Sequence, residues 1–160
     1  MHSRLLPISP GPLRDLIEKN IHMFTPAEQG GRGVECGPGW FDIVEDFLEK
    51  NKDLFMIWDV KIALIKEKFG YMRIHLDAPH GFYESEAGET CRRTMRDAII
   101  LSHKTCEVCG KSGKIGHIAG WLQCLCKKCK EEKIERRIQE EATWEATRKK
   151  LSGQGVSEKP

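Results

Sequence analysis

The sequence predicts an α+β protein: a small helical domain with a short β-sheet, followed by a cysteine-rich module and a long C-terminal helix. Three observations support this prediction. Apolar residues recur at helical spacing in several segments, and residues 71–77 alternate apolar and polar side chains as a strand does. Two C-x-x-C pairs, Cys106–Cys109 and Cys126–Cys129, are separated by sixteen residues.

The two C-x-x-C pairs have the spacing of a four-cysteine zinc site. Zinc binds four thiolates in a tetrahedron, and two intervening residues let one tight turn point both sulfurs at the ion. We therefore expect one structural Zn²⁺, bound by Cys106, Cys109, Cys126 and Cys129 in a zinc ribbon or treble-clef-like knuckle. Four thiolates close the coordination sphere, so chemistry at the metal is not expected.

Other roles for the cysteines were weighed. A redox pair or disulfides are disfavoured because the seven cysteines are odd in number and no export signal is recognisable, which predicts a reducing, intracellular compartment. Cys124 competes with Cys126 for one ligand position, but only Cys126 keeps the two-residue gap to Cys129. Cys124 is interpreted as a packed residue or a spare thiol, and His103 and His117 remain alternative ligands.

Composition limits the function classes. The 160 residues are 39% hydrophobic and 31% charged, which allows a modest core that needs support from a metal. No run reaches the roughly 18 apolar residues of a membrane span. The organisation predicted is an N-terminal helix and loop (1–36), an α+β core (37–103), a zinc knuckle (104–130), a C-terminal helix (131–151) and a flexible tail (152–160).

Charge is distributed unevenly, although the formal net charge is only +2. Between residues 104 and 130, one acidic residue, Glu107, accompanies six lysines: Lys104, Lys111, Lys114, Lys127, Lys128 and Lys130. The knuckle is therefore basic, although four thiolates around zinc add a formal −2.

The N-terminal third shows one clear helical pattern. Apolar spacing predicts a helix over 12–24, with Pro12 in its first turn. Residues 25–28 match a capping box and predict one further turn, and the glycine-rich stretch to Gly39 is expected to be a loop. We expect this third to pack on the domain and not to form a separate recognition arm.

The central segments predict two helices and a strand. An apolar face over 41–48 predicts the first helix, and Trp58, Ile62, Ile65 and Phe69 predict a second over 58–69 that ends at Gly70. Residues 71–77 are the clearest strand, with Met72, Ile74 and Leu76 on one face. The partner of this strand is expected to be the zinc hairpin, a weakly marked strand or another chain.

Two later segments predict helices with exposed charge. The first runs from Cys91 to residue 103 and carries Arg92, Arg93 and Arg96, which either contact phosphate or form a solvated face; the solvated face is the more common case. The second runs from 130 to 151 with only a thin apolar stripe, as in a helix that projects into solvent or docks on a partner.

Four short motifs, spread over about residues 37–129, resemble a group of small proteins common in bacteriophage and prophage genomes: Gly39-Trp40-Phe41-Asp42-Ile43, residues 65–74 (IKEKFGYMRI), residues 105–110 (TCEVCG) and residues 121–126 (WLQCLC). The chain departs from that pattern at Cys129, where the group often has histidine, and at Tyr71, which replaces a second glycine. The resemblance implies a phage or prophage origin, a location in the cytoplasm of the bacterial host and a zinc knuckle, but no activity.

Three function classes follow. The favoured one is a non-enzymatic zinc protein that binds a host or viral protein. It would act as an effector or inhibitor, and counter-defence is one such role. The alternative is a nucleic-acid binder, with contacts from Arg92, Arg93, Arg96, Lys111, Lys114, Lys127 and Lys128. A metal-dependent nuclease is least favoured, because His75, Asp77 and His80 are its only compact cluster. The sequence predicts neither the partner nor the oligomeric state.

Overall fold

The computed structural model describes residues 12–118 and 120–153. In chain order the helices and strands are α1 (Pro12–Lys19), β1 (Gly33–Glu35), α2 (Phe41–Trp58), β2 (Lys61–Lys68), β3 (Tyr71–Asp77), α3 (Glu86–Ser102), β4 (Lys114–Ile118), β5 (Trp121–Leu125) and α4 (Lys127–Gly153). Short 3₁₀ turns include Pro38–Trp40. Residues 1–11, residue 119 and residues 154–160, which are most of the predicted tail, lie outside the described residues.

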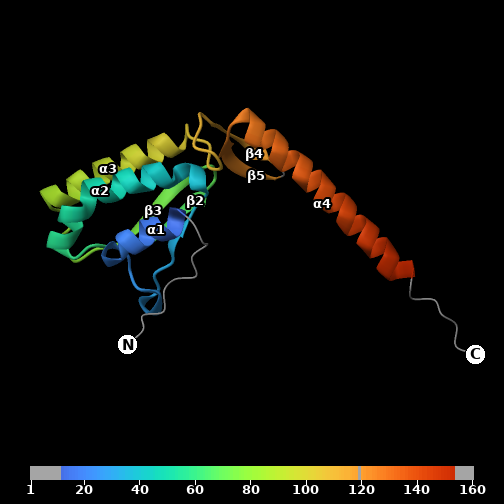
Figure 1. Cartoon of the computed structure of the whole chain (residues 1–160). Coiled ribbons are helices and arrows are strands. Elements are labelled where there is room, and N and C mark those ends of the chain that lie inside the picture. Colours follow the sequence, from blue (N-terminus) through green and yellow to red (C-terminus); the bar gives the residue numbers. More distant parts are fainter. Residues whose placement is uncertain (1–11, 119, 154–160) are drawn as a thin grey trace, which may run out of the picture.

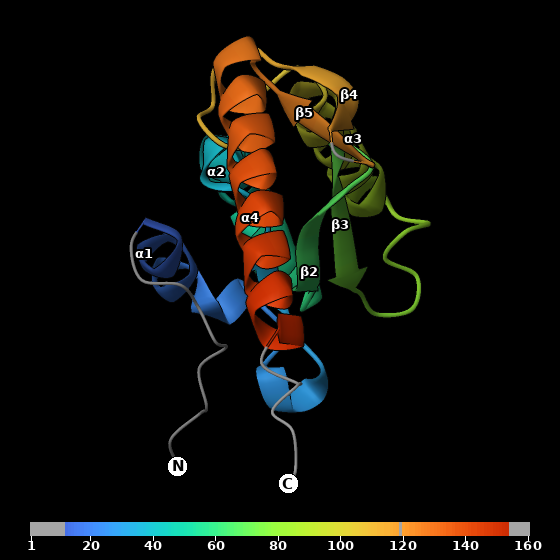
Figure 2. The ribbon, with the colours of Figure 1, turned by 90° about the vertical axis from the view of Figure 1, so that its right-hand side faces the viewer.

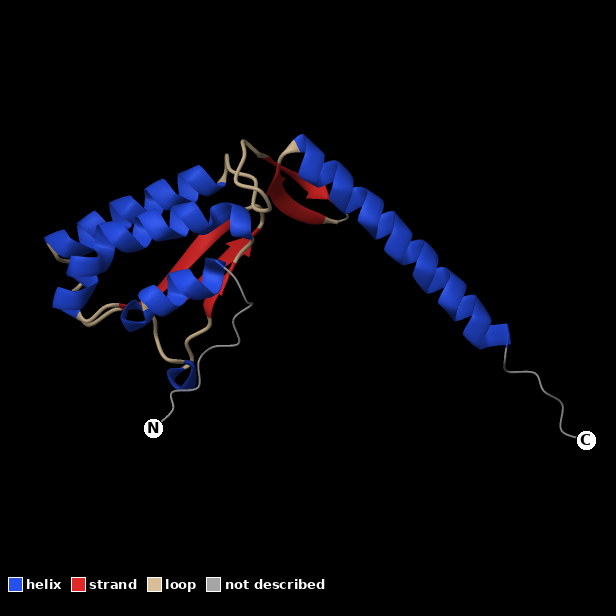
Figure 3. Ribbon diagram, in the orientation of Figure 1, coloured by secondary structure: helices blue, strands red, loops and turns tan. Residues whose placement is uncertain are grey.

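A three-stranded sheet in the order β1-β2-β3 forms the first part of the molecule. β1 runs parallel to β2, and β2 and β3 form an antiparallel hairpin. Helices α2 and α3 lie side by side along this sheet, and α1 packs nearby (Figures 1 and 3). The α+β class predicted from the sequence is therefore confirmed.

The core of this part is built from large apolar side chains between the helices and the sheet. Trp40, Phe47, Phe55 and Phe82 are each at most 1% exposed. The buried amide of Asn51 on α2 donates to Phe47 O (2.7 Å) and to the Thr94 hydroxyl of α3 (2.9 Å). These bonds satisfy a polar group inside the core and join the two long helices.

The predicted helix over 58–69 is wrong. Trp58 is the last residue of α2, residues Lys61–Lys68 form β2, and Phe69 lies in the turn to β3. A β-bulge between Ile62 and Leu64 shifts the alternation, so that Ile62 and Ile65 both pair with apolar residues of β3. The two isoleucines are therefore three residues apart in the sequence, a spacing that is also typical of one face of a helix.

The predicted strand over 71–77 is confirmed as β3, with Met72 and Ile74 buried. Its partner is β2, the segment that had been assigned to a helix. The helix predicted from Cys91 begins earlier, at Glu86, after Ser85 caps it by accepting the Gly88 amide (3.0 Å).

In the N-terminal segment the helix is shorter than predicted, and a strand is present that was not predicted. Helix α1 ends at Lys19 and is followed by a 3₁₀ turn at Ile21–Met23. The expected loop contains β1, which pairs with β2. Leu16, Ile17 and Phe24 belong to the main core, so this segment packs on the domain.

The second part of the molecule consists of the β4–β5 hairpin and α4. The hairpin joins the end of α3 to the start of α4, and α4 then extends away from the sheet (Figure 1). In the perpendicular view α4 lies in front of the sheet and runs as one uninterrupted helix (Figure 2). Every described side chain of α4 after Cys129 is exposed.

Candidate metal centre

The first C-x-x-C pair lies in a tight turn between α3 and β4. The Cys106 amide donates to Lys111 O (2.7 Å), and the Gly110 amide donates to Cys106 O (2.9 Å). Gly110 has φ +74°, a conformation that a side chain would strain, so the glycine after the second cysteine permits the turn. Thr105 and Ser112 form an isolated antiparallel bridge that closes its base.

The second pair lies at the junction of β5 and α4. Cys126 follows directly after β5, and Cys129 is in the first turn of α4. The Cys129 amide donates to Cys126 Sγ (3.5 Å), so Cys126 accepts a helix N-terminal N–H as a capping residue does. A tight turn contributes two of the four thiols and the start of α4 contributes the other two, with the β4–β5 hairpin between them. Of the two expected arrangements, this one resembles the treble clef.

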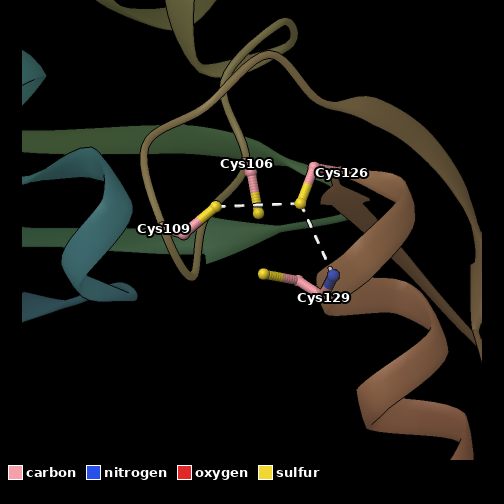
Figure 4. A group of neighbouring side chains, drawn as sticks. All are labelled: Cys106, Cys109, Cys126 and Cys129. Carbon is pink, nitrogen blue, oxygen red and sulfur yellow. Dashed lines mark hydrogen bonds between the residues drawn. The ribbon is translucent and has the colours of Figure 1, made fainter.

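All four sulfur atoms lie within 4.8 Å of one another. Cys109 Sγ and Cys126 Sγ are 3.7 Å apart, and the four side chains converge on one point (Figure 4). Sulfur atoms around a zinc ion are expected about 3.8 Å apart, the edge of a tetrahedron with Zn–S bonds of about 2.3 Å. The donor set and its geometry therefore fit a four-coordinate metal ion.

The environments of the two helix cysteines differ. The Cys129 amide is the main cause that lowers the pKa of the Cys126 thiol to about 7. Burial raises the pKa of the Cys129 thiol. Cys129 and Cys106 pack with Ile118 and Leu125 in a small apolar cluster, whereas Cys109 lies at the surface.

The turn also contacts the start of α2, which sequence reasoning missed. The Gly39 amide donates to Glu107 O (2.7 Å), and the indole of buried Trp40 donates to Thr105 O (2.8 Å). A Cβ at Gly39 would lie 2.1 Å from Cys106 O, so only glycine fits there. Gly37 and Gly39, next to Trp40, could have indicated this contact from the sequence, because glycine permits another backbone to approach closely.

The competing ligands lie elsewhere. Cys124 is fully buried in the main core and its thiol donates to His103 O (3.3 Å). The His103 ring packs on Tyr71, with ring centroids 4.9 Å apart. His117 is an exposed residue of β4. Among the described residues, the only group of three or more metal-ligand side chains is the predicted set of four cysteines.

The predicted arginine contacts are not next to this centre. Arg92 lies ten residues before the end of α3, about 15 Å along the helix. It pairs with Glu89 (2.7 Å), and Arg93 donates to the Thr90 hydroxyl (3.1 Å). With Arg96 these residues are on the exposed surface of α3, as in the solvated-face interpretation.

The predicted lysine contacts lie in the same module as the metal centre, and Lys111, Lys114, Lys127 and Lys128 are all exposed. Lys127 lies 3.9 Å from Glu131, and Lys128 lies 3.7 Å from Glu132. These i,i+4 pairs along α4 reduce the positive field of the first helical turn.

The compact cluster considered for a nuclease is not assembled. His75, Asp77 and His80 are exposed, and Asp77 accepts a hydrogen bond from the Thr25 hydroxyl (2.5 Å). They do not form a metal-binding group in the part of the chain that the structure describes. Asp77 instead ties the N-terminal segment to the end of β3.

Comparisons with models of known protein families, with curated proteins and with solved structures found no match. None of the described helices is long and apolar enough to cross a membrane.

Proposed function

We propose that this chain is a non-enzymatic protein in which one structural Zn²⁺ holds a module that presents α4 to a protein partner. The observation that carries the proposal is the exposure of α4. Its 27 residues leave the body of the molecule directly from the metal centre, and its described side chains beyond Cys129 are all exposed. Most of the stability of helices in proteins comes from packing against other elements, so a partner that packs on α4 would stabilise it.

Zinc is the proposed metal because four thiolates in a tetrahedral arrangement are its typical structural donor set. The closed set leaves no position for substrate, which supports a structural role. Zinc would fix the angle at which α4 leaves the hairpin, since Cys126 directly precedes the helix, Cys129 lies in its first turn, and Cys106 and Cys109 lie in the turn attached to the core.

The exposed apolar residues of α4 are the proposed contacts. Trp144 and Leu151 are each 68% exposed and are seven residues apart, so they share one side of the helix. Ile138 is 62% exposed on another side. Tryptophan and leucine side chains buried at an interface contribute large apolar areas.

The partner class follows from the motifs. We propose a host or phage protein as the partner and the bacterial cytoplasm as the location, as the resemblance to phage and prophage proteins implies. The effector or inhibitor role belongs to the same proposal. Outside the metal centre, no group of three or more His, Cys, Asp or Glu side chains among the described residues could hold a catalytic metal ion.

The test is affinity capture from bacterial host lysate, with and without nuclease, followed by quantitative mass spectrometry. The double variant Trp144→Ala/Leu151→Ala should lower the capture of the partner at least about tenfold. The matched control is Met56→Ala/Ile57→Ala, which removes equally exposed apolar side chains (69% and 78%) from α2. Equal capture by both variants, or loss of all captured proteins with nuclease, would contradict the proposal.

Nucleic-acid binding is the second candidate, and the exposed lysines around the metal centre favour it. If nucleic acid is the partner, affinity should fall steeply with salt and Lys127→Glu/Lys128→Glu should abolish binding. The ion pairs of Lys127 and Lys128 with Glu131 and Glu132 weigh against it.

A further inference from the structure

A groove lies between the β4–β5 hairpin and the first turn of α4. Its volume is about 490 Å³. Gly116, Ile118 and Leu125 of the hairpin form its floor, and Lys114, Lys127 and Lys130 lie around it. We call it the knuckle groove. It is separate from the apolar residues at the far end of α4.

The charge in the groove is of one sign. No aspartate or glutamate lines it. Among the described residues, Lys114 and Lys130 form no ion pair, and Lys127 has only its 3.9 Å contact with Glu131. Cys126 also lines the groove, and four thiolates around Zn²⁺ would place a formal −2 behind that wall. Three lysines therefore line the groove together with one cysteine of the metal centre, and the ammonium group of Lys130 lies above Gly116.

The lining also limits the shape of an occupant. Its apolar lining residues include Ile118 and Leu125, and no aromatic residue lines it. Nucleic-acid bases bind single-strand sites largely by stacking on aromatic rings, which this groove does not offer. Aliphatic walls suit an aliphatic side chain, and ammonium groups suit carboxylates.

Gly116 leaves the space in the floor. A Cβ at this position would meet only Lys130 Nζ, at 3.9 Å, within 4 Å. Gly116 pairs with Gln123 in a regular antiparallel ladder. A side chain is therefore sterically allowed at this strand position, and glycine leaves that part of the groove open.

We propose that the knuckle groove binds an acidic peptide segment of a protein partner, with a leucine or isoleucine side chain on the floor and carboxylates beside Lys114 and Lys130. This inference rests on the proposed protein-binding function and adds a second contact site with its own ligand chemistry. The segment would lie next to the base of α4, so that one partner can contact the groove and the helix together.

The test uses the full chain loaded with zinc and a fluorescein-labelled Asp-Glu-Leu-Asp-Glu peptide, followed by fluorescence anisotropy. Gly116→Val should weaken binding at least about tenfold, because its side chain fills the floor. Lys114→Glu and Lys130→Glu should each weaken binding about three- to tenfold. Lys111→Glu is the matched control, since Lys111 is an exposed lysine of the same module that does not line the groove.

Zinc content and thermal unfolding of each variant should match the unmodified chain; if Gly116→Val fails to fold, the exposed lysine variants carry the test. Replacing the peptide's leucine with serine should also weaken binding. No peptide binding, equal effects of Lys111→Glu and Lys114→Glu, or no effect of removing leucine would overturn the proposal. Tighter binding of a labelled oligothymidylate, lost with Lys114→Glu, would overturn it in favour of nucleic acid.

Capture from lysate separates this inference from the proposed function. Lysate capture that depends on Trp144 and Leu151 but not on Gly116 would refute the groove and leave the proposed function in place. No specific capture by the unmodified chain would refute the proposed function itself.

Discussion

The helix–sheet core and the metal module (residues 104–130) are stabilised in different ways. The core cluster contains twenty buried hydrophobic side chains of described residues, including five aromatic residues that are at most 3% exposed. The cluster in the module contains four, and two of them, Cys106 and Cys129, are proposed metal ligands. Apolar burial can hold the core, whereas we expect the module, with its small cluster, to depend on the proposed metal for folding.

The two regions are nevertheless joined by specific contacts. Trp40 and Gly39 at the start of α2 hydrogen-bond to the first cysteine turn. Cys124 of β5 belongs to the main core. Loss of the metal should therefore disorder the module first and weaken the core only through these contacts.

The largest expected effect is that of metal removal. A strong chelator should unfold the module, because structural zinc contributes on the order of 10 kcal/mol to the folding of small zinc domains. The α2–α3–sheet core should remain folded. Hydrogen exchange checks this: protection should be lost in 104–130 and retained in α2 and β3. Simultaneous loss in both regions would show that they fold as one unit.

Single cysteine variants test the ligand set. Cys109→Ser leaves three thiolates and should lower zinc content severely. Cys124→Ser should keep one zinc per chain and cost about 1 kcal/mol, since a hydroxyl can also donate to His103 O. Metal analysis and chemical denaturation measure both. Zinc loss in Cys124→Ser with retention in Cys109→Ser would reverse the assignment.

The contact between the regions is tested at Gly39. Gly39→Ala places a Cβ against two backbone atoms of the cysteine turn, Cys106 O at 2.1 Å and Gly110 N at 2.4 Å. We expect a loss of about 2–4 kcal/mol in the free energy of unfolding, together with weaker zinc affinity. Gly116→Ala is the control, because its Cβ would make only an ordinary van der Waals contact, with Lys130 Nζ at 3.9 Å. Equal stability of the two variants would mean that the turn moves without cost.

The smallest expected effect is at the turn between β2 and β3. Phe69 is 53% exposed and has φ +59°, and Gly70 follows with φ +86°, which makes this a type I′ turn. Phe69→Asn should raise the free energy of unfolding by about 0.5–1 kcal/mol, because asparagine tolerates this conformation better. Zinc affinity should not change. A destabilised variant in chemical denaturation would show that the Phe69 ring makes contacts that outweigh the strain.

The sequence by itself determined the features that depend on neighbours in the chain. Spacing of two residues within each cysteine pair was enough to predict which four thiols lie together, because one turn and one helix start orient each pair. Strict alternation predicted β3, and a polar run without glycine or proline predicted most of α4.

Only the tertiary structure decided the features that depend on distant segments. A bulge beside Ile62 makes β2 look helical in sequence, and its true state depends on pairing with β1 and β3. The contact of Gly39 with Cys106 joins residues far apart in the chain. The knuckle groove likewise depends on how α4 leaves the hairpin. Long-range packing sets all three, and local residue patterns carry little information about it.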